Sequence, residues 1–295
     1  MPELPEIEAY IVALRSRVVG KTIRNITVKS FSLLRTYDPP IDAAIGHSVE
    51  SLSRMGKRIV FSLSDDLHLV LHLMVAGRLQ WRAPGAKVPG KVGLAAFDFD
   101  DGTLTLTEQG TKRRASLHVV RGSEAVAALD PGGMELETAT LEAFSAALKK
   151  ERHTLKRTLT DAHLFSGIGG AFADEILHRA GLSPLQMSDR LSEEAERDLF
   201  DATRAVLDEW RTIRIDETGD DFPKKVTAFH PKMAVHGKFG EPCPVCDSPI
   251  QRIVYASRET NYCATCQTGG RILADRSLSR LLKDDWPKTV DELEG

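Results

Sequence analysis

Cysteines and long hydrophobic runs are both scarce in this chain of 295 residues. The four cysteines all lie between positions 243 and 266, which favours a metal site in a reducing compartment over disulfides. No run of about 18 apolar residues occurs, so a membrane-spanning helix is not expected. The acidic first residues differ from the basic and apolar start of a secretory signal, and we therefore expect a cytoplasmic protein.

A strong net charge is also lacking, because 39 Lys and Arg oppose 42 Asp and Glu, for a net charge of −3. That average argues against nucleic acid as a partner. Residues 223–283 depart from it, with ten Lys and Arg against four Asp and Glu. Such a local excess predicts one face that binds phosphates. The hydrophobic content of 42% is ordinary for a globular protein, and the length allows two or three domains.

The first eight residues, Met-Pro-Glu-Leu-Pro-Glu-Ile-Glu, place carboxylates around one potential nucleophile. If Met1 is removed, Pro2 carries a secondary amine, and α-amino groups titrate about two pH units below lysine. A free amine attacks carbonyl-like carbons to form a Schiff base, and Glu3 and Glu6 could relay protons beside it. A purely structural alternative is that Pro2 and Pro5 begin a helix whose dipole favours the glutamates.

Hydrophobic periodicity predicts an α+β multidomain protein. A helix is expected over 7–18, ending near Gly20, followed by short β-branched runs that favour a β-sandwich flanked by that helix. Asp101-Gly102 is a hairpin signal between two of the runs. Examples of these runs are 23–28, 58–63, 67–73, 94–99 and 103–107.

The turn formers of 129–133 predict a linker before a helical region. Helical patterns cover 141–150, 153–161, 171–180 and 192–210, the last with Ser192 as its N-cap. Residues 211–240 are charged and irregular, and we expect a long loop there, followed by a strand. The predicted domains are a sandwich over 1–130, a helical domain over 131–234, a finger over 235–268 and a tail over 269–295.

Three further motifs permit two interpretations each. Lys57 follows Gly56 at the start of an expected strand, and Lys112-Arg113-Arg114 forms a dense basic loop. The glycines of 167–170 leave backbone N–H groups at the start of a helix, where a phosphate could bind. The alternatives are an exposed lysine, a solvated loop and a plain turn between helices.

The four cysteines form two C-x-x-C pairs separated by sixteen residues, Cys243/Cys246 and Cys263/Cys266. Four thiolates at this spacing predict one tetrahedral structural Zn²⁺, with no open position for catalysis. The intervening residues suit a two-stranded hairpin with Arg258 at its tip. A redox dithiol is the alternative, and the pairing of two knuckles argues against it.

Together these motifs resemble the formamidopyrimidine-DNA glycosylase / endonuclease VIII family, on the formamidopyrimidine-glycosylase side. The N-terminal octapeptide, Met-Gly-Lys57, the Gly-Ile-Gly-Gly-Ala-Phe-Ala-Asp-Glu-Ile-Leu segment and the cysteine pairs occur in one order over about residues 1–267. The resemblance implies a β-sandwich, a helix–two-turn–helix domain and a zinc finger. It also implies, as the partner, double-stranded DNA with a damaged base or an abasic site, and a monomeric protein without membrane attachment.

The resemblance also implies roles for individual residues. Pro2 would attack C1′ of a flipped nucleotide and form the Schiff base, with Glu3 as the proton relay and Glu6 shaping the pocket. Lys57 would contact phosphate and take part in β-elimination, and Arg258 would act at the flanking phosphates in δ-elimination. The remaining matching positions, expected to contact DNA or the lesion, are Met74, Arg113, Lys156 and Gly170.

The sequence departs from the family pattern at several of these positions. Gly170 stands where Asn is common, and Ala115 stands where a Phe helps to fill the void left by the flipped base. Either Met74 or Val75 takes the place of the family's methionine. The loop 211–233 does not match well enough for residues to be transferred. The tail is an addition, and its apolar residues predict a short helix that packs back on the protein (Leu273, Leu278, Leu281, Leu282 and Trp286).

The expected function is that of a bifunctional DNA glycosylase and abasic-site lyase that removes oxidised or ring-opened purines by β,δ-elimination. Three alternatives stay open. One is a damage-binding protein without catalysis, and another is a zinc-ribbon regulator of duplex DNA. The third keeps the chemistry and changes the substrate, to abasic sites or pyrimidine lesions.

Overall fold

The computed structural model describes the chain except for residues 111, 224–225, 227–228, 256–257, 275–279, 282–286 and 294–295. It divides into two compact units. Unit 1 contains residues 1–131 and 209–227, and unit 2 contains residues 132–208 and 228–295. Among the described residues, no helix combines the length and the apolar character needed to cross a membrane.

Unit 1 begins with helix α1 (Leu4–Val18), which starts three residues earlier than predicted. Pro5 lies in its first turn, where a missing backbone N–H costs nothing because that group has no partner within the helix. The expected stripe is buried: Ile7, Ile11, Leu14 and Val18 are each at most 2% exposed. Gly20, with a φ of +81°, follows the end of the helix as expected.

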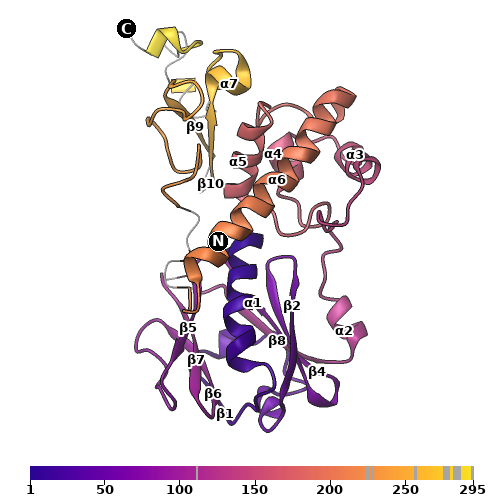
Figure 1. Ribbon diagram of the computed structural model, residues 1–295, viewed down its shortest axis with the longest axis vertical. Helices are drawn as coiled ribbons and strands as arrows, with labels where there is room; N and C mark the ends of the chain where they lie inside the picture. The colour runs from indigo at the N-terminus through magenta and orange to yellow at the C-terminus, as the bar shows by residue number, and fades with distance from the viewer. Residues whose placement is uncertain are drawn as a thin grey trace. The chain divides into compact units, whose positions relative to one another are not determined.

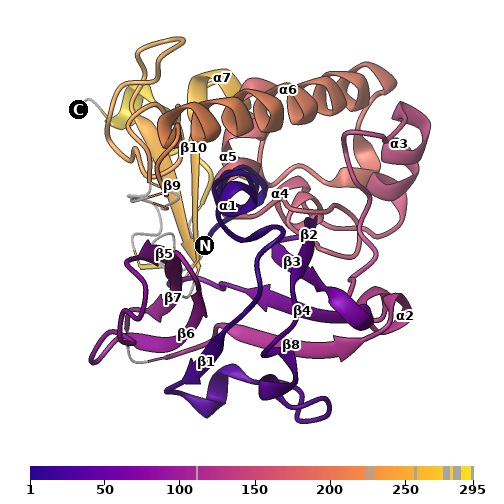
Figure 2. The ribbon, with the colours of Figure 1, turned by 60° about the horizontal axis from the view of Figure 1, so that its bottom comes forward.

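Two four-stranded antiparallel sheets form the sandwich of unit 1 (Figure 1). One sheet has the order β2-β3-β4-β8 and the other β1-β6-β7-β5. Figure 2 looks nearly along the axis of α1, with strands of both sheets beside it. The strands are β1 (Asn25–Val28), β2 (Val49–Met55), β3 (Arg58–Leu63), β4 (Leu67–His72), β5 (Gly77–Arg82), β6 (Gly93–Phe99), β7 (Gly102–Glu108) and β8 (Ser116–Arg121).

The predicted β-sandwich is therefore confirmed, as is the hairpin at Asp101-Gly102, where Phe99 pairs with Gly102. Apolar side chains from both sheets meet in one core, for example Phe61 and Leu69 from one sheet and Leu104 from the other. Three strands, β2, β5 and β8, are not among the examples named from the sequence. Each of these strands mixes polar with apolar residues, and all three lie at a sheet edge, where one side needs no partner strand.

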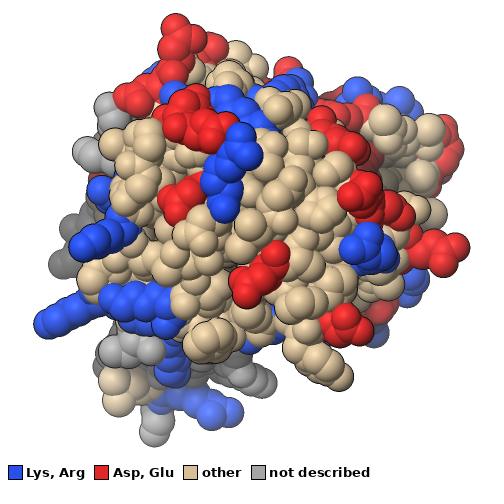
Figure 3. Space-filling model, turned by 90° about the horizontal axis from the view of Figure 1, so that it is seen from below, with Lys and Arg blue, Asp and Glu red and all other residues tan. Residues whose placement is uncertain are grey.

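Shorter elements complete unit 1. Helix α2 (Ser123–Ala127) follows β8, and turns of 3₁₀ helix cover Phe31–Leu33, Ile41–Ala44 and Ser64–Asp66. One face of the described molecule is drawn in Figure 3, where uncharged residues cover a broad area. On this face, Lys and Arg gather at the lower left.

Unit 2 is helical. It contains α3 (Leu141–Lys149), α4 (Leu155–Leu159), α5 (Gly170–Arg179) and the first part of α6 (Glu193–Thr218), with a 3₁₀ turn at Ser188–Arg190. The side chain of Ser192 accepts a hydrogen bond from the N–H of Ala195, as an N-cap should. Aromatic rings in tilted contact form part of the core, with Phe144 centred 5.0 Å from Phe165 and 5.2 Å from Phe200.

One prediction about α6 was wrong. The loop expected from residue 211 begins only after Thr218, because the helix continues for two more turns. Those turns belong to unit 1, where Arg214 is buried. A charged residue at a buried position breaks the apolar stripe from which the helix end was judged.

The finger in unit 2 is an antiparallel hairpin of β9 (Ile250–Tyr255) and β10 (Arg258–Cys263), followed by α7 (Ala264–Thr268). Part of the tail does pack back on it. Ile272 and Leu273 cluster with Tyr262 and Ala264, and the Leu273 N–H donates to the Tyr262 hydroxyl at 2.8 Å. A 3₁₀ turn covers Asp291–Leu293. Most of the predicted tail helix, with Leu278, Leu282 and Trp286, lies outside the described residues.

Candidate active site and zinc centre

The N-terminal amine lies among buried charged groups of unit 1. Glu3 is 2% exposed, and its backbone N–H donates to the Glu6 carboxylate at 2.9 Å. Burial lowers the pKa of the Met1 α-amino group, as do Arg78 and Lys57, whereas Glu3 and Glu6 oppose the shift. This group is the amine of Met1; once Met1 is removed, the amine of Pro2 would lie at the adjoining position.

Lys57 approaches the same group of charges. It stands at the turn between β2 and β3, and burial lowers its pKa while Glu3 raises it. Two amines and two carboxylates thus influence one another at the start of α1. An arrangement of titratable groups with shifted pKa values is typical of acid–base chemistry.

Glu6 forms a buried ion pair that the sequence did not reveal. Its Oε1 accepts a hydrogen bond from Nε of Arg214 at 3.0 Å, and the two side chains are 2% and 7% exposed. Burial raises the pKa of Glu6 to about 7, although Arg214 opposes this increase. Glu6 can therefore exchange a proton near neutral pH.

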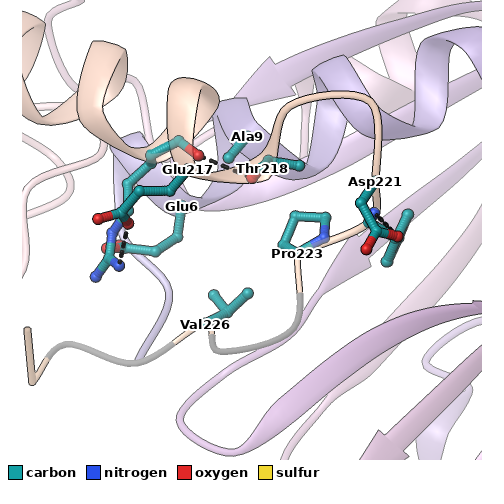
Figure 4. Close-up of a pocket in the computed structure, with 9 residues that line it drawn as sticks. Glu6, Ala9, Glu217, Thr218, Asp221, Pro223 and Val226 are labelled. Atoms are coloured by element: carbon teal, nitrogen blue, oxygen red, sulfur yellow. Dashed lines mark hydrogen bonds and ion pairs between the residues drawn. The ribbon is translucent and has the colours of Figure 1, made fainter.

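A cavity of about 340 Å³ opens beside this ion pair (Figure 4). Its walls come from α1, from the last turns of α6 and from the chain that follows α6. Phe222 anchors that chain in the core of unit 1, with its ring centred 5.6 Å from Tyr10. The lining residues are Glu6, Ala9, Arg214, Glu217, Thr218, Asp221, Phe222, Pro223 and Val226.

His72, at the end of β4, has a buried ring nitrogen that was not predicted from the sequence. Its Nε2 is buried and has no hydrogen-bond partner among the described residues. Burial, with Arg58, Lys57 and His118, lowers its pKa to about 4, so the ring is neutral at pH 7. Buried polar atoms without partners are uncommon in proteins and are often satisfied by a ligand or water. His72 therefore joins Lys57 as a candidate for binding an oxygen atom.

The turn that follows β4 presents the methionine position. Met74 is half-buried in the left-handed region, with a φ of +53°, and Val75 is 56% exposed. Gly77 is required here, because a Cβ at this position would lie 2.2 Å from the carbonyl oxygen of Leu73. Strained backbone of this kind persists where the surrounding structure holds it.

The basic loop before β8 is anchored by Glu108, which is 2% exposed. Its carboxylate accepts hydrogen bonds from the N–H groups of Arg114 and Ala115 at 2.9 to 3.0 Å. Arg113 is exposed, and its guanidinium donates to the carbonyl oxygen of Lys91. Ala115 is buried, so it offers no side chain to fill a void in DNA.

In unit 2, the expected DNA-contacting residues surround α5. Gly170 is its exposed first residue, and a Cβ there would meet nothing within 4 Å. Lys156 on α4 donates to Asp174 at 2.6 Å and to the carbonyl oxygen of Glu259 at 2.9 Å. Arg258, which precedes Glu259, is exposed at the start of β10.

The four cysteines fit one tetrahedral zinc ion. Their Sγ atoms all lie within 4.8 Å of one another, and the Sγ of Cys246 is 3.4 Å from those of Cys263 and Cys266. A Zn–S bond of about 2.3 Å in a tetrahedron implies Sγ–Sγ distances of about 3.8 Å. The donor set leaves no ligand position for substrate, so the protein carries one structural Zn²⁺, held by Cys243, Cys246, Cys263 and Cys266.

The structure thus places the predicted site residues in two groups. Unit 1 holds Pro2, Glu3, Glu6, Lys57, Met74 and Arg113, whereas unit 2 holds Lys156, Gly170, Arg258 and the cysteines. No role at the site was predicted from the sequence for Arg214, His72 or Glu108. The spacing of Val206, Trp210 and Ile213 could have extended α6 and placed Arg214 on a helix.

Three family models match the chain in order. The N-terminal domain of formamidopyrimidine-DNA glycosylase matches residues 1–116, and the helix–two-turn–helix domain of the same enzyme matches residues 128–222. The zinc finger found in this glycosylase and in isoleucyl-tRNA synthetase matches residues 240–269.

Curated relatives span nearly the whole chain. The formamidopyrimidine-DNA glycosylase of Solibacter usitatus (strain Ellin6076) is 32% identical over 275 residues, covering 90% of this chain and 99% of the relative. The enzyme of the same name from Thermus thermophilus is 31% identical over 279 residues, covering 92% of this chain and 100% of the relative.

Solved structures agree with this match. A mutant of the Lactococcus lactis enzyme in complex with a Fapy-dG containing DNA has a TM-score of 0.81 and 26% identity. The match covers 90% of this chain and 100% of that chain. The Lactococcus lactis enzyme with an abasic site containing DNA has a TM-score of 0.80 and 26% identity, covering 90% of this chain and 99% of that chain. The chain belongs to the formamidopyrimidine-DNA glycosylase family.

Proposed function

We propose that this protein is a base-excision repair enzyme that releases oxidised or ring-opened purines from double-stranded DNA and then cleaves the abasic site. The observation that carries this proposal is the start of the chain in a member of this family, where Pro2 and Glu3 are buried and the charges of Glu3, Glu6 and Lys57 act on the amine of Met1, the residue before Pro2. Cellular DNA would be its partner, and we place the protein in a bacterial cytoplasm. The proposal also includes the domain boundaries expected from the sequence, which lie after residues 130, 234 and 268.

The nucleophile is the secondary amine of Pro2 after Met1 is removed. Its nitrogen forms a bond to C1′ as the glycosidic bond breaks, and the electron pair leaves with the base, which takes up a proton. The nitrogen then gives up its own proton, and the ring C1′–O4′ bond breaks to leave an iminium ion, while the ring oxygen takes up a proton. Glu3 is the relay for these protons, since it lies beside the amine and interacts with Lys57 through charge.

Cleavage of the strand follows from the iminium ion. Loss of a C2′ proton expels the 3′-phosphate, and a second elimination expels the 5′-phosphate. Lys57, with a lowered pKa, is suited to the first step, because a larger share of its amine is unprotonated than in an exposed lysine. Neutral His72 beside Lys57 can donate a hydrogen bond to a phosphate oxygen. Arg258 would bind the phosphates of the second step.

The cavity beside Glu6 would receive the flipped base. At about 340 Å³ it lies within the usual range for small-molecule sites. Arg214 supplies N–H donors for carbonyl oxygens, and Glu6 can accept from or donate to a ring nitrogen, since its pKa is about 7. Oxidised and ring-opened purines present both kinds of group. Flipping costs less at a damaged nucleotide, which favours such lesions further.

Residues of the loops and of unit 2 would hold the DNA. Met74 and Arg113 are expected to fill the space vacated by the flipped nucleotide. Ala115 is buried and would contribute no side chain there. Gly170 would offer its backbone to a phosphate at the start of α5. Lys156 holds the carbonyl oxygen of Glu259 and so supports the strand that carries Arg258.

Borohydride trapping tests the proposal. Purified full-length protein is incubated with duplexes that carry a formamidopyrimidine, 8-oxoguanine or an abasic site, and a reducible Schiff base is trapped covalently. We expect an adduct that maps to Pro2 with all three duplexes, and a weaker one with Pro2→Gly, whose terminal amine is primary instead of secondary. Glu3→Gln serves as the matched variant, because it keeps the terminal amine and removes the proton relay; it should bind DNA and excise slowly.

Each of the other outcomes would support a different function or a different nucleophile. An adduct on the abasic duplex alone would identify a lyase without base excision. Binding of all duplexes with no adduct would contradict the enzyme and leave a damage-binding protein. An adduct that maps in the parent protein to another amine, such as that of Lys57, would remove Pro2 as the nucleophile.

A further inference from the structure

A buried histidine contacts the zinc site from outside. His178, in the last turn of α5, is 8% exposed. Its Nε2 lies 3.3 Å from Sγ of Cys243, which is fully buried. We propose that His178 is a positioning residue of the zinc centre, whose Nε2–H donates to the Cys243 thiolate, fixes the metal to α5 and slows the loss of zinc.

The direction of the hydrogen bond follows from the chemistry of the site. A zinc-bound thiolate has no proton, so Cys243 can only accept, and the proton must lie on Nε2 of His178. Four thiolates on one Zn²⁺ carry two net negative charges. A hydrogen-bond donor to a thiolate that water cannot reach offsets part of that charge. Outer partners of metal ligands typically change metal affinity 10- to 100-fold.

The same helix holds the finger at two further points. The carboxylate of Glu175 accepts from the backbone N–H groups of Ala234, Val235 and His236 at 2.8 to 2.9 Å. Asp174 binds the His236 ring at 2.8 Å and Lys156 at 2.6 Å. These contacts remain when the His178 ring is replaced, so a variant there should fold and differ mainly at the metal.

The structure therefore makes α5 a platform for the finger. His178 binds the metal-ligand end, Glu175 binds the chain leading into the knuckles, and Asp174 acts through Lys156 on β10. Zinc retention and the position of the Arg258 strand are then linked through one helix. This link concerns the metal and the finger, and it does not depend on the proposed glycosylase activity.

Zinc release tests the proposal. Zinc-loaded full-length protein is mixed with excess chromogenic chelator, and the rate of transfer is followed by absorbance. In His178→Phe, which keeps a ring and loses the donor, we expect release about ten-fold or more faster than in the parent protein. His153→Phe is the matched control, because its ring nitrogens contact Arg152 and Glu151 in the same unit and not the zinc site.

Equal release rates in His178→Phe and the parent would overturn the proposal. A second measurement needs no variant. In the ¹⁵N spectrum of zinc-loaded protein, His178 should be the neutral tautomer with its proton on Nε2, protected from exchange. A ring protonated only on Nδ1, or an Nε2 proton that exchanges as in free histidine, would refute it even if His178→Phe failed to fold. Neither readout involves DNA, so failure here leaves the glycosylase proposal standing.

Discussion

Replacing Arg214 with Met should destabilise the protein by an amount that grows with pH. Glu6 is buried and has a pKa of about 7, above the value of 4.5 of a free glutamate. Its ionised form is therefore disfavoured in the folded state, and the corresponding stability, fully present below pH 4.5, is lost as pH rises through 7. The difference between the two pKa values corresponds to about 3 kcal/mol at high pH.

Arg214 limits this loss, since its charge opposes the increase in the pKa of Glu6. Its removal should raise that pKa further, and an opposite charge at this distance commonly changes a pKa by about two pH units. Linkage then gives an added loss of under ~0.1 kcal/mol at roughly pH 6, about 0.4 kcal/mol at pH 7 and about 2 kcal/mol at pH 8.5. A lost hydrogen bond adds about 1 kcal/mol at every pH.

Urea unfolding of the parent and of Arg214→Met at pH 6, 7 and 8.5 measures this trend. Arg24→Met is the matched control, because Arg24 pairs with Asp100 on the surface of the same unit and should show no trend with pH across this range. In the Glu6→Gln background, replacing Arg214 with Met should lower the free energy of unfolding by the same amount at all three pH values. An equal loss at pH 6 and pH 8.5 in Arg214→Met would refute the reasoning.

Two further predictions concern packing. Leu273→Ala should destabilise the finger by about 2–4 kcal/mol, since Leu273 is buried against Tyr262. Tyr262→Phe removes one hydrogen bond and should cost about 1 kcal/mol. Hydrogen exchange of the β9 and β10 amides measures both losses, and unchanged exchange in Leu273→Ala would contradict the contact. Gly77→Ala should cost about 2 kcal/mol or more in urea unfolding, because the Cβ meets the Leu73 carbonyl. Gly170→Ala, with open space around it, should cost less, and equal losses would contradict this account.

The sandwich was predictable where local pattern and tertiary environment agree. β3 was predicted to the residue, because Arg58–Leu63 is rich in apolar and β-branched residues and pairs on both sides. β2 (Val49–Met55) was missed, since an edge strand with Glu50, Ser51, Ser53 and Arg54 shows no strong apolar signal. A register shift between Val49 and Ser51 also interrupts the alternation that a strand covered on one face would otherwise show.

The zinc ligands were predictable because their chemistry lies in local spacing. The Glu6–Arg214 pair was not, because its members are 208 positions apart and only the fold brings them together. Arg214 even obscured its own helix, since a charge on the buried face resembles a break in the apolar stripe. His178 was hidden for the same reason, as its partner Cys243 is 65 positions away.

Lys156 shows how a fold can change the meaning of a matched residue. The resemblance implies a lysine near the DNA backbone, and a free ammonium there would bind phosphate as a point charge. Here its Nζ already donates to Asp174 and to the carbonyl oxygen of Glu259, with the side chain only 15% exposed. Asp174 neutralises its charge, so a direct phosphate contact would have to compete with a close ion pair. The geometry favours a positioning role, in which Lys156 holds the first residues of β10 and thereby supports the strand from which we propose that Arg258 contacts DNA.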